Sequence, residues 1–385
     1  MVKLEDYHGP HISKALQKCF DLLGGIQNII SPRSKVFVKI NHLSPPSPPS
    51  KAIITHPYLT REVLRFLKNL ECQITVGDDI QSFQKNGTTV SGYRQMCEKM
   101  GVDLVNLKEV GFQEISCSGA KLKRLHLSPR VLEADCLINL PKLKTHSFTV
   151  FTGAVKNMYG MIPYGRRLHY HRQFSLPDDF SQMLVDIYAS IPPNLTIMDA
   201  VVAMEGEGPS AGQPRKTKTL LASEDGVAVD AVSSKMVRFH PMDIPTTYHA
   251  HQRFLGNGDM NWIQVLGEDL NHRIVKDFKH SEAATGMFRR RTPQLLYALI
   301  QGQLTLIPEI IPQSCTGCQE CIRICPTGAA RWFKGKAWIH PGPCIHCMCC
   351  HEVCRFQAIK LKMRPVGKIV RKGISLTHRI RSLWK

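Results

Sequence analysis

Short apolar runs alternate with helical apolar spacing over most of the first 240 residues of the chain. Segments 35–41, 73–76, 102–107, 135–140, 195–198 and 219–223 are rich in β-branched and other apolar residues, which is typical of strands buried in a sheet. Between them, apolar positions recur every three to four residues in 59–70, 92–100, 180–190 and 229–237, which indicates helices. Because strands that alternate with helices pair in parallel through right-handed crossovers, the sequence predicts an open, mostly parallel α/β sheet with helices on both faces.

Polar side chains stand at or just beyond the ends of these strands, where ligands bind in open α/β sheets. Lys142, Lys144 and His146 alternate directly after segment 135–140, so they share one side if the backbone stays extended. The other polar residues near strand ends are Lys39, Asn41, Asp78, Lys156, Asn157, Asp199, Glu205 and Asp225.

These residues predict a site for a small anionic substrate. His146 and Lys144 are the predicted catalytic residues, with His146 as a proton donor at neutral pH. The predicted substrate-binding residues are Lys39, Asn41, Asp78, Lys142, Lys156, Asn157, Asp199 and Glu205. The alternative is structural, with the cations on a solvated edge or in salt bridges to Asp199 and Asp225.

Two matching sets of four cysteines stand near the C-terminus. Two, two and three residues separate successive cysteines in each set, which are Cys315, Cys318, Cys321 and Cys325, then Cys344, Cys347, Cys350 and Cys354. Three cysteines on one tight loop can hold three irons of a cube, and in bacterial two-cluster ferredoxins the fourth ligand comes from the other set. The spacing therefore predicts two [4Fe–4S] clusters, one held by Cys315, Cys318, Cys321 and Cys354, and one by Cys344, Cys347, Cys350 and Cys325.

Zinc is the alternative metal for these thiols. A structural zinc site closes with four ligands, usually as two separated pairs, so three cysteines at this spacing, repeated twice, overfill one site and fit two poorly. Segment 329–339, with Lys334-Gly335-Lys336 in its middle, predicts two short strands around a turn that connect the two sets. Iron–sulfur clusters are the favoured interpretation.

Other ligand motifs are weaker. The glycine-rich segment 204–209 lacks the Lys-Ser or Lys-Thr ending of a nucleotide loop and does not match the dinucleotide fingerprint, so neither ATP nor NAD is predicted. The pairs His169/His171 and His249/His251 would bind a further metal if each pair shares a strand face, and otherwise belong to surface loops.

Length and composition set the organisation and the compartment. With 385 residues, 43% of them apolar, the chain is long enough for two or three units. Residues 1–18 have no apolar run after a basic start, and 295–311 is too short and polar to cross a bilayer. Fourteen cysteines then favour a reducing cytoplasm. We predict an α/β domain of one lobe or two over 1–310, a ferredoxin-type domain over 311–363, and a tail over 364–385.

The tail is strongly basic. Formal net charge is +19, and after Glu352 the chain has ten Lys or Arg and no Asp or Glu. The apolar residues of the tail recur at a spacing of three to four, which predicts a basic amphipathic helix; they are Ile369, Leu376, Ile380, Leu383 and Trp384. Such a helix would contact an anionic membrane surface or an acidic partner, or pack on the protein itself. Nucleic acid ranks third, because Trp384 is the one aromatic residue of the basic run.

Several segments, in order, resemble one family. They are KIN at 39–41, VGD at 76–78, NLPKLKTHSFTVFTGAVKNMYGMIP at 139–163, MEGEGP at 204–209 and the final pair of cysteine sets. They resemble the iron–sulfur proteins catalogued as domain of unknown function 362, from about residue 35 to about residue 362. The resemblance implies a ferredoxin-type protein without a settled substrate. It also implies a common site at Lys142, Lys144, His146, Lys156 and Asn157, with Glu205, Gly206 and Gly208 as its second part.

Together these features predict an iron–sulfur electron-transfer protein, leaning towards an oxidoreductase. In the first hypothesis two clusters deliver electrons to a small anionic substrate in the α/β domain. In the second, the α/β domain docks another redox protein and the chain is a non-catalytic carrier or assembly partner. A structural role for the clusters is the third, and the weakest, since exchanged ligands are typical of electron transfer. A redox partner protein is expected for the first two.

Overall fold

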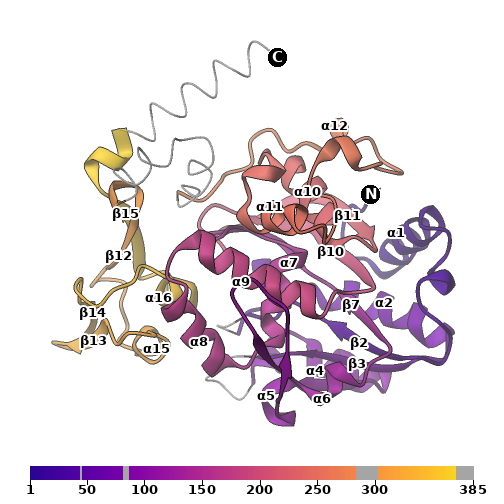
Figure 1. Ribbon diagram of the computed structural model, residues 1–385, viewed down its shortest axis with the longest axis horizontal. Helices are drawn as coiled ribbons and strands as arrows, with labels where there is room; N and C mark the ends of the chain where they lie inside the picture. The colour runs from indigo at the N-terminus through magenta and orange to yellow at the C-terminus, as the bar shows by residue number, and fades with distance from the viewer. Residues whose placement is uncertain (44–45, 81–85, 283–301, 370–385) are drawn as a thin grey trace.

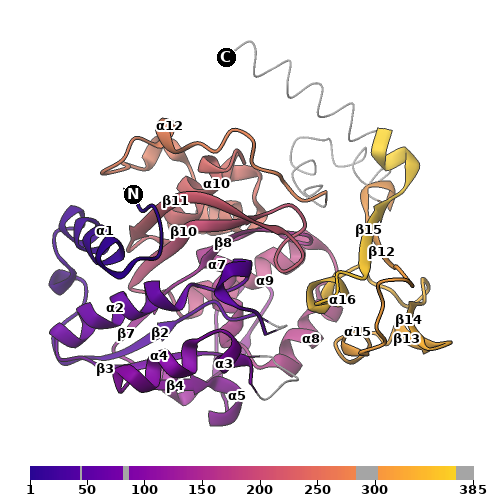
Figure 2. The same cartoon turned by 180° about the vertical axis from the view of Figure 1, so that it is seen from behind.

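A nine-stranded sheet forms the centre of the computed structural model, which describes residues 1–43, 46–80, 86–282 and 302–369 (Figures 1 and 2). Its strands are β1 (Val2–Lys3), β2 (Lys35–Lys39), β3 (Gln73–Asp78), β4 (Asp103–Asn106), β7 (Cys136–Asn139), β8 (Lys142–His146), β9 (Val150–Thr152), β10 (Leu195–Glu205) and β11 (Gln213–Ser223). Their order is β1-β11-β10-β7-β2-β3-β4, with β8 paired to β10 and β9 paired to β8. A separate antiparallel pair is formed by β5 (Gln113–Ser116) and β6 (Arg124–Leu127).

Most pairs in the sheet are parallel. β4, β3, β2, β7 and β10 pair in parallel one after the other, and β8 also runs parallel to β10. β1, β11 and β9 add antiparallel pairs. Successive side chains point to opposite faces, so Val36 and Val38 pack in one core cluster while Phe37 packs in another. Both faces are therefore buried, and the predicted α/β class is confirmed.

Helices cover both faces of the sheet. Apolar residues of α1, α2 and α4 form one core cluster with the central strands, and those of α7 and α9 form the cluster on the opposite face. The helices are α1 (Gly9–Leu22), α2 (Pro57–Asn69), α3 (Gly87–Val90), α4 (Tyr93–Met100), α5 (Leu107–Val110), α6 (Pro129–Leu132), α7 (Ala154–Asn157), α8 (Tyr164–Gln173), α9 (Pro177–Ser190), α10 (Gly226–Met236), α11 (Pro245–Gln252) and α12 (Leu270–Arg273).

β10 and β11 differ from the expected short strands. Each has eleven residues, and they form a long antiparallel hairpin. Asp199 therefore lies inside a strand rather than at its end. Asp225 caps α10 instead, where its carboxylate accepts the backbone N–H groups of Val227 and Ala228. The predicted run 195–198 is only the first part of β10, and the predicted run 219–223 is only the last part of β11.

The paired histidines lie on helices, not on strands or loops. His169 and His171 belong to α8, and His249 and His251 belong to α11. Residues two apart on a helix point in different directions. Within the described ranges these histidines form no group of ligands for a metal ion.

The C-terminal unit is built from two small antiparallel sheets and two short helices. Its elements are β12 (Leu306–Ile310), α15 (Glu320–Arg323), β13 (Ala330–Phe333), β14 (Lys336–Ile339), α16 (Cys349–Val353) and β15 (Ile359–Met363). β13 and β14 form the expected hairpin, and the turn residues Lys334 and Gly335 both have positive φ, as a tight two-residue turn requires. Because β12 pairs with β15, this unit begins at or before Leu306, ahead of the predicted boundary at 311.

The C-terminal unit touches the α/β unit through α16. In both views α16 faces α8, whereas the β13–β14 hairpin lies on the outer side of the unit (Figures 1 and 2). Among the described residues, no helix is long and apolar enough to cross a membrane. The predicted basic helix falls largely in 370–385, outside the described residues.

Candidate functional site

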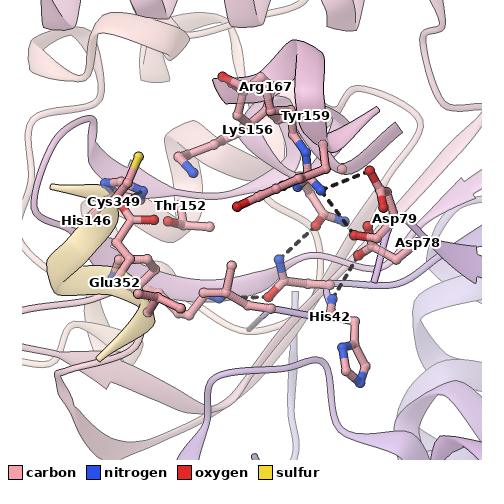
Figure 3. A pocket seen from close by; sticks show the side chains of 18 of the residues that line it. His42, Asp78, Asp79, His146, Thr152, Lys156, Tyr159, Arg167, Cys349 and Glu352 are labelled. Atoms are coloured by element: carbon pink, nitrogen blue, oxygen red, sulfur yellow. Dashed lines mark hydrogen bonds and ion pairs between the residues drawn. The ribbon is translucent and has the colours of Figure 1, made fainter. Parts of the chain in front are cut away.

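A cavity lies where the carboxyl ends of β2 and β3 meet α7, α8 and α16. Figure 3 shows Asp78, Asp79 and Arg167 at one end, His146, Cys349 and Glu352 at the other, and Lys156 between them. The lining residues with polar or ionisable side chains are Lys39, Asn41, His42, Asp78, Asp79, Lys144, His146, Thr152, Lys156, Asn157, Tyr159, Tyr164, Arg167, His171, Cys349 and Glu352. Seven of the ten predicted residues of the α/β domain, Lys39, Asn41, Asp78, Lys144, His146, Lys156 and Asn157, are thus in one place.

Two buried ion pairs close one end of the cavity. Lys39, at the end of β2, donates to Asp78 at the end of β3 over 2.9 Å. The guanidinium of Arg167 lies 3.1 Å from the carboxylate of Asp79. Neighbouring parallel strands bring Lys39 beside Gly77, so the pairing follows from the strand register. These four charges compensate one another, and the pairs shape the cavity more than they attract ligands.

Hydrogen bonds between Lys144 and two asparagine side chains fix the middle of the cavity wall. Lys144 donates to Asn41 Oδ1 over 2.7 Å and to the carbonyl of Ile53 over 2.7 Å. Asn41 donates in turn to Asn157 Oδ1 over 3.0 Å. Burial, with the nearby charges of Lys156 and Lys142, lowers the pKa of Lys144 well below its usual range. Lys144 is therefore a fixed part of the wall, held by neutral oxygens.

Lys156 is the cation that the described part of the cavity does not pair. Its ammonium points into the cavity (Figure 3). The ion pairs that the described residues form around the cavity join Lys39 to Asp78 and Arg167 to Asp79, and the imidazole of His146 faces Glu352; none of these contacts includes Lys156. Burial lowers its pKa, and Glu352 acts against that shift. Thr152 Oγ1 and His171 Nδ1, on the same lining, are buried without a hydrogen-bond partner among the described residues. A cation and unsatisfied polar atoms on one wall suit a polar, negatively charged ligand.

His146 is neutral and its tautomer is determined by the backbone. Nδ1 accepts the N–H groups of Phe148 over 3.0 Å and of Thr149 over 3.3 Å. Burial and the charges of Lys156 and Lys144 lower the pKa of His146 well below its usual range. A neutral ring that accepts at Nδ1 carries its proton on Nε2. The ring is thus a neutral hydrogen-bond donor through Nε2, and the role of His146 as a proton donor to substrate stays a prediction.

Two residues that the sequence analysis did not select come from α16. Glu352 Oε1 lies 3.4 Å from His146 Nε2, and burial raises the pKa of Glu352 to about 7. Cys349 lines the cavity beside it (Figure 3). The clues were present: Cys349 is the thiol left over from the cluster spacing, and Glu352 is the last acidic residue before the basic tail.

The remaining predicted residues lie outside the cavity. Lys142 is buried and donates to Asp199 over 2.9 Å and to Tyr7 over 2.8 Å. Asp199 also accepts the Tyr7 hydroxyl and the backbone N–H of His56. Glu205 is buried and accepts the backbone N–H of Lys279. Lys142 and Asp199 therefore form a structural salt bridge, as the alternative interpretation of the sequence predicted, and Glu205 binds the backbone of this chain.

The cysteines gather in two groups that fit two clusters with exchanged ligands. Around buried Cys321, whose pKa rises to about 12, the neighbouring thiols are Cys354, Cys318 and Cys315. Cys344 has Cys347 and Cys325 as neighbours. Cys350 has Cys347, Cys344 and Cys325 around it, and also Cys321 of the first group, so the two groups lie next to each other.

The fourth cysteine of each set also accepts a backbone N–H from four residues further on. Cys325 Sγ accepts from Ala329 over 3.1 Å, and Cys354 Sγ accepts from Ala358 over 3.2 Å. Such donors favour the thiolate that iron requires. The donor set is therefore suited to iron–sulfur clusters.

Two family models match the chain. The model described as "Domain of unknown function (DUF362)" matches residues 36–235, which contain every lining residue contributed by the α/β unit. The model described as "4Fe-4S dicluster domain" matches residues 307–355.

Individual proteins match parts of this chain that differ in length. A thylakoid-associated protein of Synechocystis is 29% identical over 248 residues, which cover 64% of this chain and 76% of that protein. An iron–sulfur protein of Rhodospirillum rubrum is 34% identical over 70 residues, 17% of this chain and 37% of that protein. Among solved structures, the lactate racemase apoprotein of Thermoanaerobacterium thermosaccharolyticum has a TM-score of 0.40 at 13% identity, over 58% of this chain and 53% of that one.

Proposed function

The chain belongs to the family of domain of unknown function 362 and carries a 4Fe–4S dicluster domain, and from this premise we propose that it is an electron-transfer enzyme acting on a small anionic substrate. One observation carries the proposal. Cys349 and Glu352, which stand among the predicted cluster ligands, line the same cavity as Lys156 and His146 of the α/β unit. Electrons and substrate would thus meet at the boundary between the two units.

The cofactor part of the proposal assigns two [4Fe–4S] clusters. Cys315, Cys318, Cys321 and Cys354 would hold one, and Cys344, Cys347, Cys350 and Cys325 the other. When bound, such clusters supply single electrons at low potential. More members of the second group would stand beside the cavity, because Cys349 lies between Cys347 and Cys350 and Ile324 precedes Cys325, whereas the first group has only Cys354, which follows Val353.

The substrate part rests on charge and on unsatisfied atoms. Lys156 has no carboxylate within ion-pair distance among the described residues, whereas Lys39 and Arg167 each have one. An anionic group on the substrate would satisfy Lys156 and remove the cost of burying it unpaired. His146 would donate its Nε2 hydrogen to an oxygen of the same substrate in place of the 3.4 Å contact with Glu352, since Nε2 has no hydrogen-bond partner in the described structure.

The test is anaerobic and compares three proteins. The clusters are reduced chemically, a fractionated metabolite extract is added, and their reoxidation is followed by absorbance in the wild type, His146→Ala and Lys156→Met. We expect a fraction of anionic metabolites to reoxidise the wild type at least tenfold faster than either variant, with all three equally fast towards ferricyanide. If reoxidation of every protein requires a second redox protein, the chain is a carrier and the enzyme proposal fails.

A further inference from the structure

The outer face of the C-terminal unit exposes large aromatic side chains. Trp332, Phe333 and Trp338 of the β13–β14 hairpin are 48%, 56% and 44% exposed. The rings of Phe333 and Trp338 lie 6.5 Å apart, so their exposed faces form one surface. A hairpin of two four-residue strands gains little by leaving three such side chains in water, and clustered exposed aromatic residues commonly mark interaction sites.

A groove runs beside this hairpin. Its floor and walls are mostly apolar, and include Ile307, Pro308, Ile310, Phe333 and Trp338. Its cations and one carboxylate are Lys334, Lys336, Lys362 and Glu309, and Glu309 is paired with Lys362. Lys334 and Lys336 are paired with no carboxylate in the described part of the chain, so they give the groove a positive rim.

The groove lies next to the first group of cysteines. The ammonium of Lys336 donates to the carbonyl of Cys315 over 2.6 Å. On the hairpin's other side, a Cβ added to Gly317 would lie 2.8 Å from the indole of Trp332, so this ring covers the loop between Cys315 and Cys318. Cys318 is itself exposed. The cavity, in contrast, is lined by Cys349, Glu352 and Val353 of α16. In both views α16 lies on the side of the unit away from the hairpin (Figures 1 and 2).

We infer that the groove of the β13–β14 hairpin is the docking site of a small acidic electron-transfer protein. The inference rests on the proposed electron-transfer function and adds the place and chemistry of the partner. An apolar centre with a positive rim fits a partner that surrounds its redox group with carboxylates, because such charges steer encounter and orient the pair. The partner exchanges electrons with the group that holds Cys318, and the second group serves the cavity.

The test uses the full-length protein with its clusters and a flavodoxin as the acidic probe. Phe333→Ser/Lys334→Asp removes the most exposed ring and one rim charge and leaves the Lys336–Cys315 contact intact; aspartate tolerates the positive φ at 334. The matched control is Phe254→Ser/Lys108→Asp, on exposed residues of the α/β unit with the same change in charge. Anaerobic stopped flow gives the rate constant of electron exchange in the downhill direction, and calorimetry gives the Kd of the oxidised proteins.

We expect the hairpin variant to lower the second-order rate constant and weaken binding at least tenfold at low salt, and the control to change both less than twofold. Exchange with methyl viologen should be the same in all proteins. Equal losses in the hairpin and control variants, or no exchange between wild type and flavodoxin, would overturn the docking site while leaving the proposed enzyme function standing. Clusters that neither reagent can reduce or oxidise would instead refute the electron-transfer function itself.

Discussion

The imidazole Nε2 of His146 lies 3.4 Å from the carboxylate Oε1 of Glu352, although 206 positions separate the two residues in the chain. His146 ends β8 of the α/β unit, and Glu352 belongs to α16 between two predicted cluster ligands. Ser210 reinforces the contact by donating its hydroxyl to the backbone carbonyl of Glu352. The cavity is therefore completed by the C-terminal unit, and an α/β unit alone would leave it open on that side.

Glu352 Oε1, 3.4 Å from His146 Nε2, is expected to orient the ring until a substrate oxygen accepts the Nε2 hydrogen. Glu352→Ala removes that contact, so we expect reoxidation of the reduced protein by its substrate to slow about tenfold, the value of one hydrogen bond. Glu352→Gln keeps an oxygen in place and should recover to within about threefold of wild type. The measurement is the anaerobic reoxidation rate, with ferricyanide as the reagent that bypasses the cavity. Equal losses in the Gln and Ala variants would show that the charge matters and the acceptor does not.

Much of the fold could be predicted because its strands are buried on both faces. Continuous apolar runs such as 36–38 and 136–138 have no polar side to place in water, so the pattern alone identifies them. The second half of β10 was missed because Asp199 interrupts its apolar run, and the first half of β11 was missed because residues 213–218 are mostly polar, although the two halves pair in one long hairpin. Similarly, α8 has a mostly polar surface, and its Arg and His residues resemble those of a loop.

The position of a site residue could be predicted only where that residue lies at the end of a strand. Lys39 and Asp78 end neighbouring parallel strands, so their meeting follows from the order of elements. Lys142 and Lys156 are both lysines near a strand end, yet Lys142 pairs with Asp199 inside the sheet. That difference depends on the three-dimensional position of one carboxylate. Glu352 could not be placed at all, because no local pattern shows which surface of the C-terminal unit meets the α/β unit.

The exchange of ligands between cysteine sets predicts which variants fail together. Cys354→Ser should remove the same cluster as Cys315→Ser, and Cys325→Ser the same cluster as Cys344→Ser, lowering iron from about eight to about four atoms per chain in each case. Cys349→Ser should keep all the iron. Iron and sulfide analysis with EPR of the reduced proteins makes the comparison. If Cys325→Ser resembled Cys315→Ser, the fourth ligand would come from within each set.

Lys142 and Lys156 should respond in opposite ways to the same substitution. Lys142→Met leaves the carboxylate of Asp199 buried without its cation, and removal of one member of a buried pair costs about 3–5 kcal/mol. Lys156→Met removes a buried cation with no ion-pair partner among the described residues, so stability should stay the same or rise while substrate affinity is lost. Anaerobic urea unfolding followed by circular dichroism measures the first effect, and reoxidation kinetics measures the second.

Lys18→Met is the control for this comparison, because Lys18 forms an exposed pair with Glu268 over 3.6 Å. Exposed pairs contribute about 0–1 kcal/mol, so this variant should unfold close to wild type. A loss for Lys156→Met as large as that for Lys142→Met would mean that Lys156 has a structural partner, and would remove it from the predicted substrate site.

Buried His42 should make the fold sensitive to mild acid. Burial, with the charges of Lys39 and Lys144, lowers its pKa from 6.5 to about 4. Between these values the unfolded chain binds a proton that the folded protein does not, so stability is complete above pH 6.5 and falls as pH drops towards 4. At 1.36 kcal/mol for each pKa unit, the loss amounts to about 3 kcal/mol. We expect His42→Gln to lose this part of the slope in unfolding free energy measured between pH 7 and 5. His272→Gln is a matched change at an exposed position and should keep the wild-type slope. If wild type and His42→Gln had the same slope, protonation of the buried ring would carry no cost in stability.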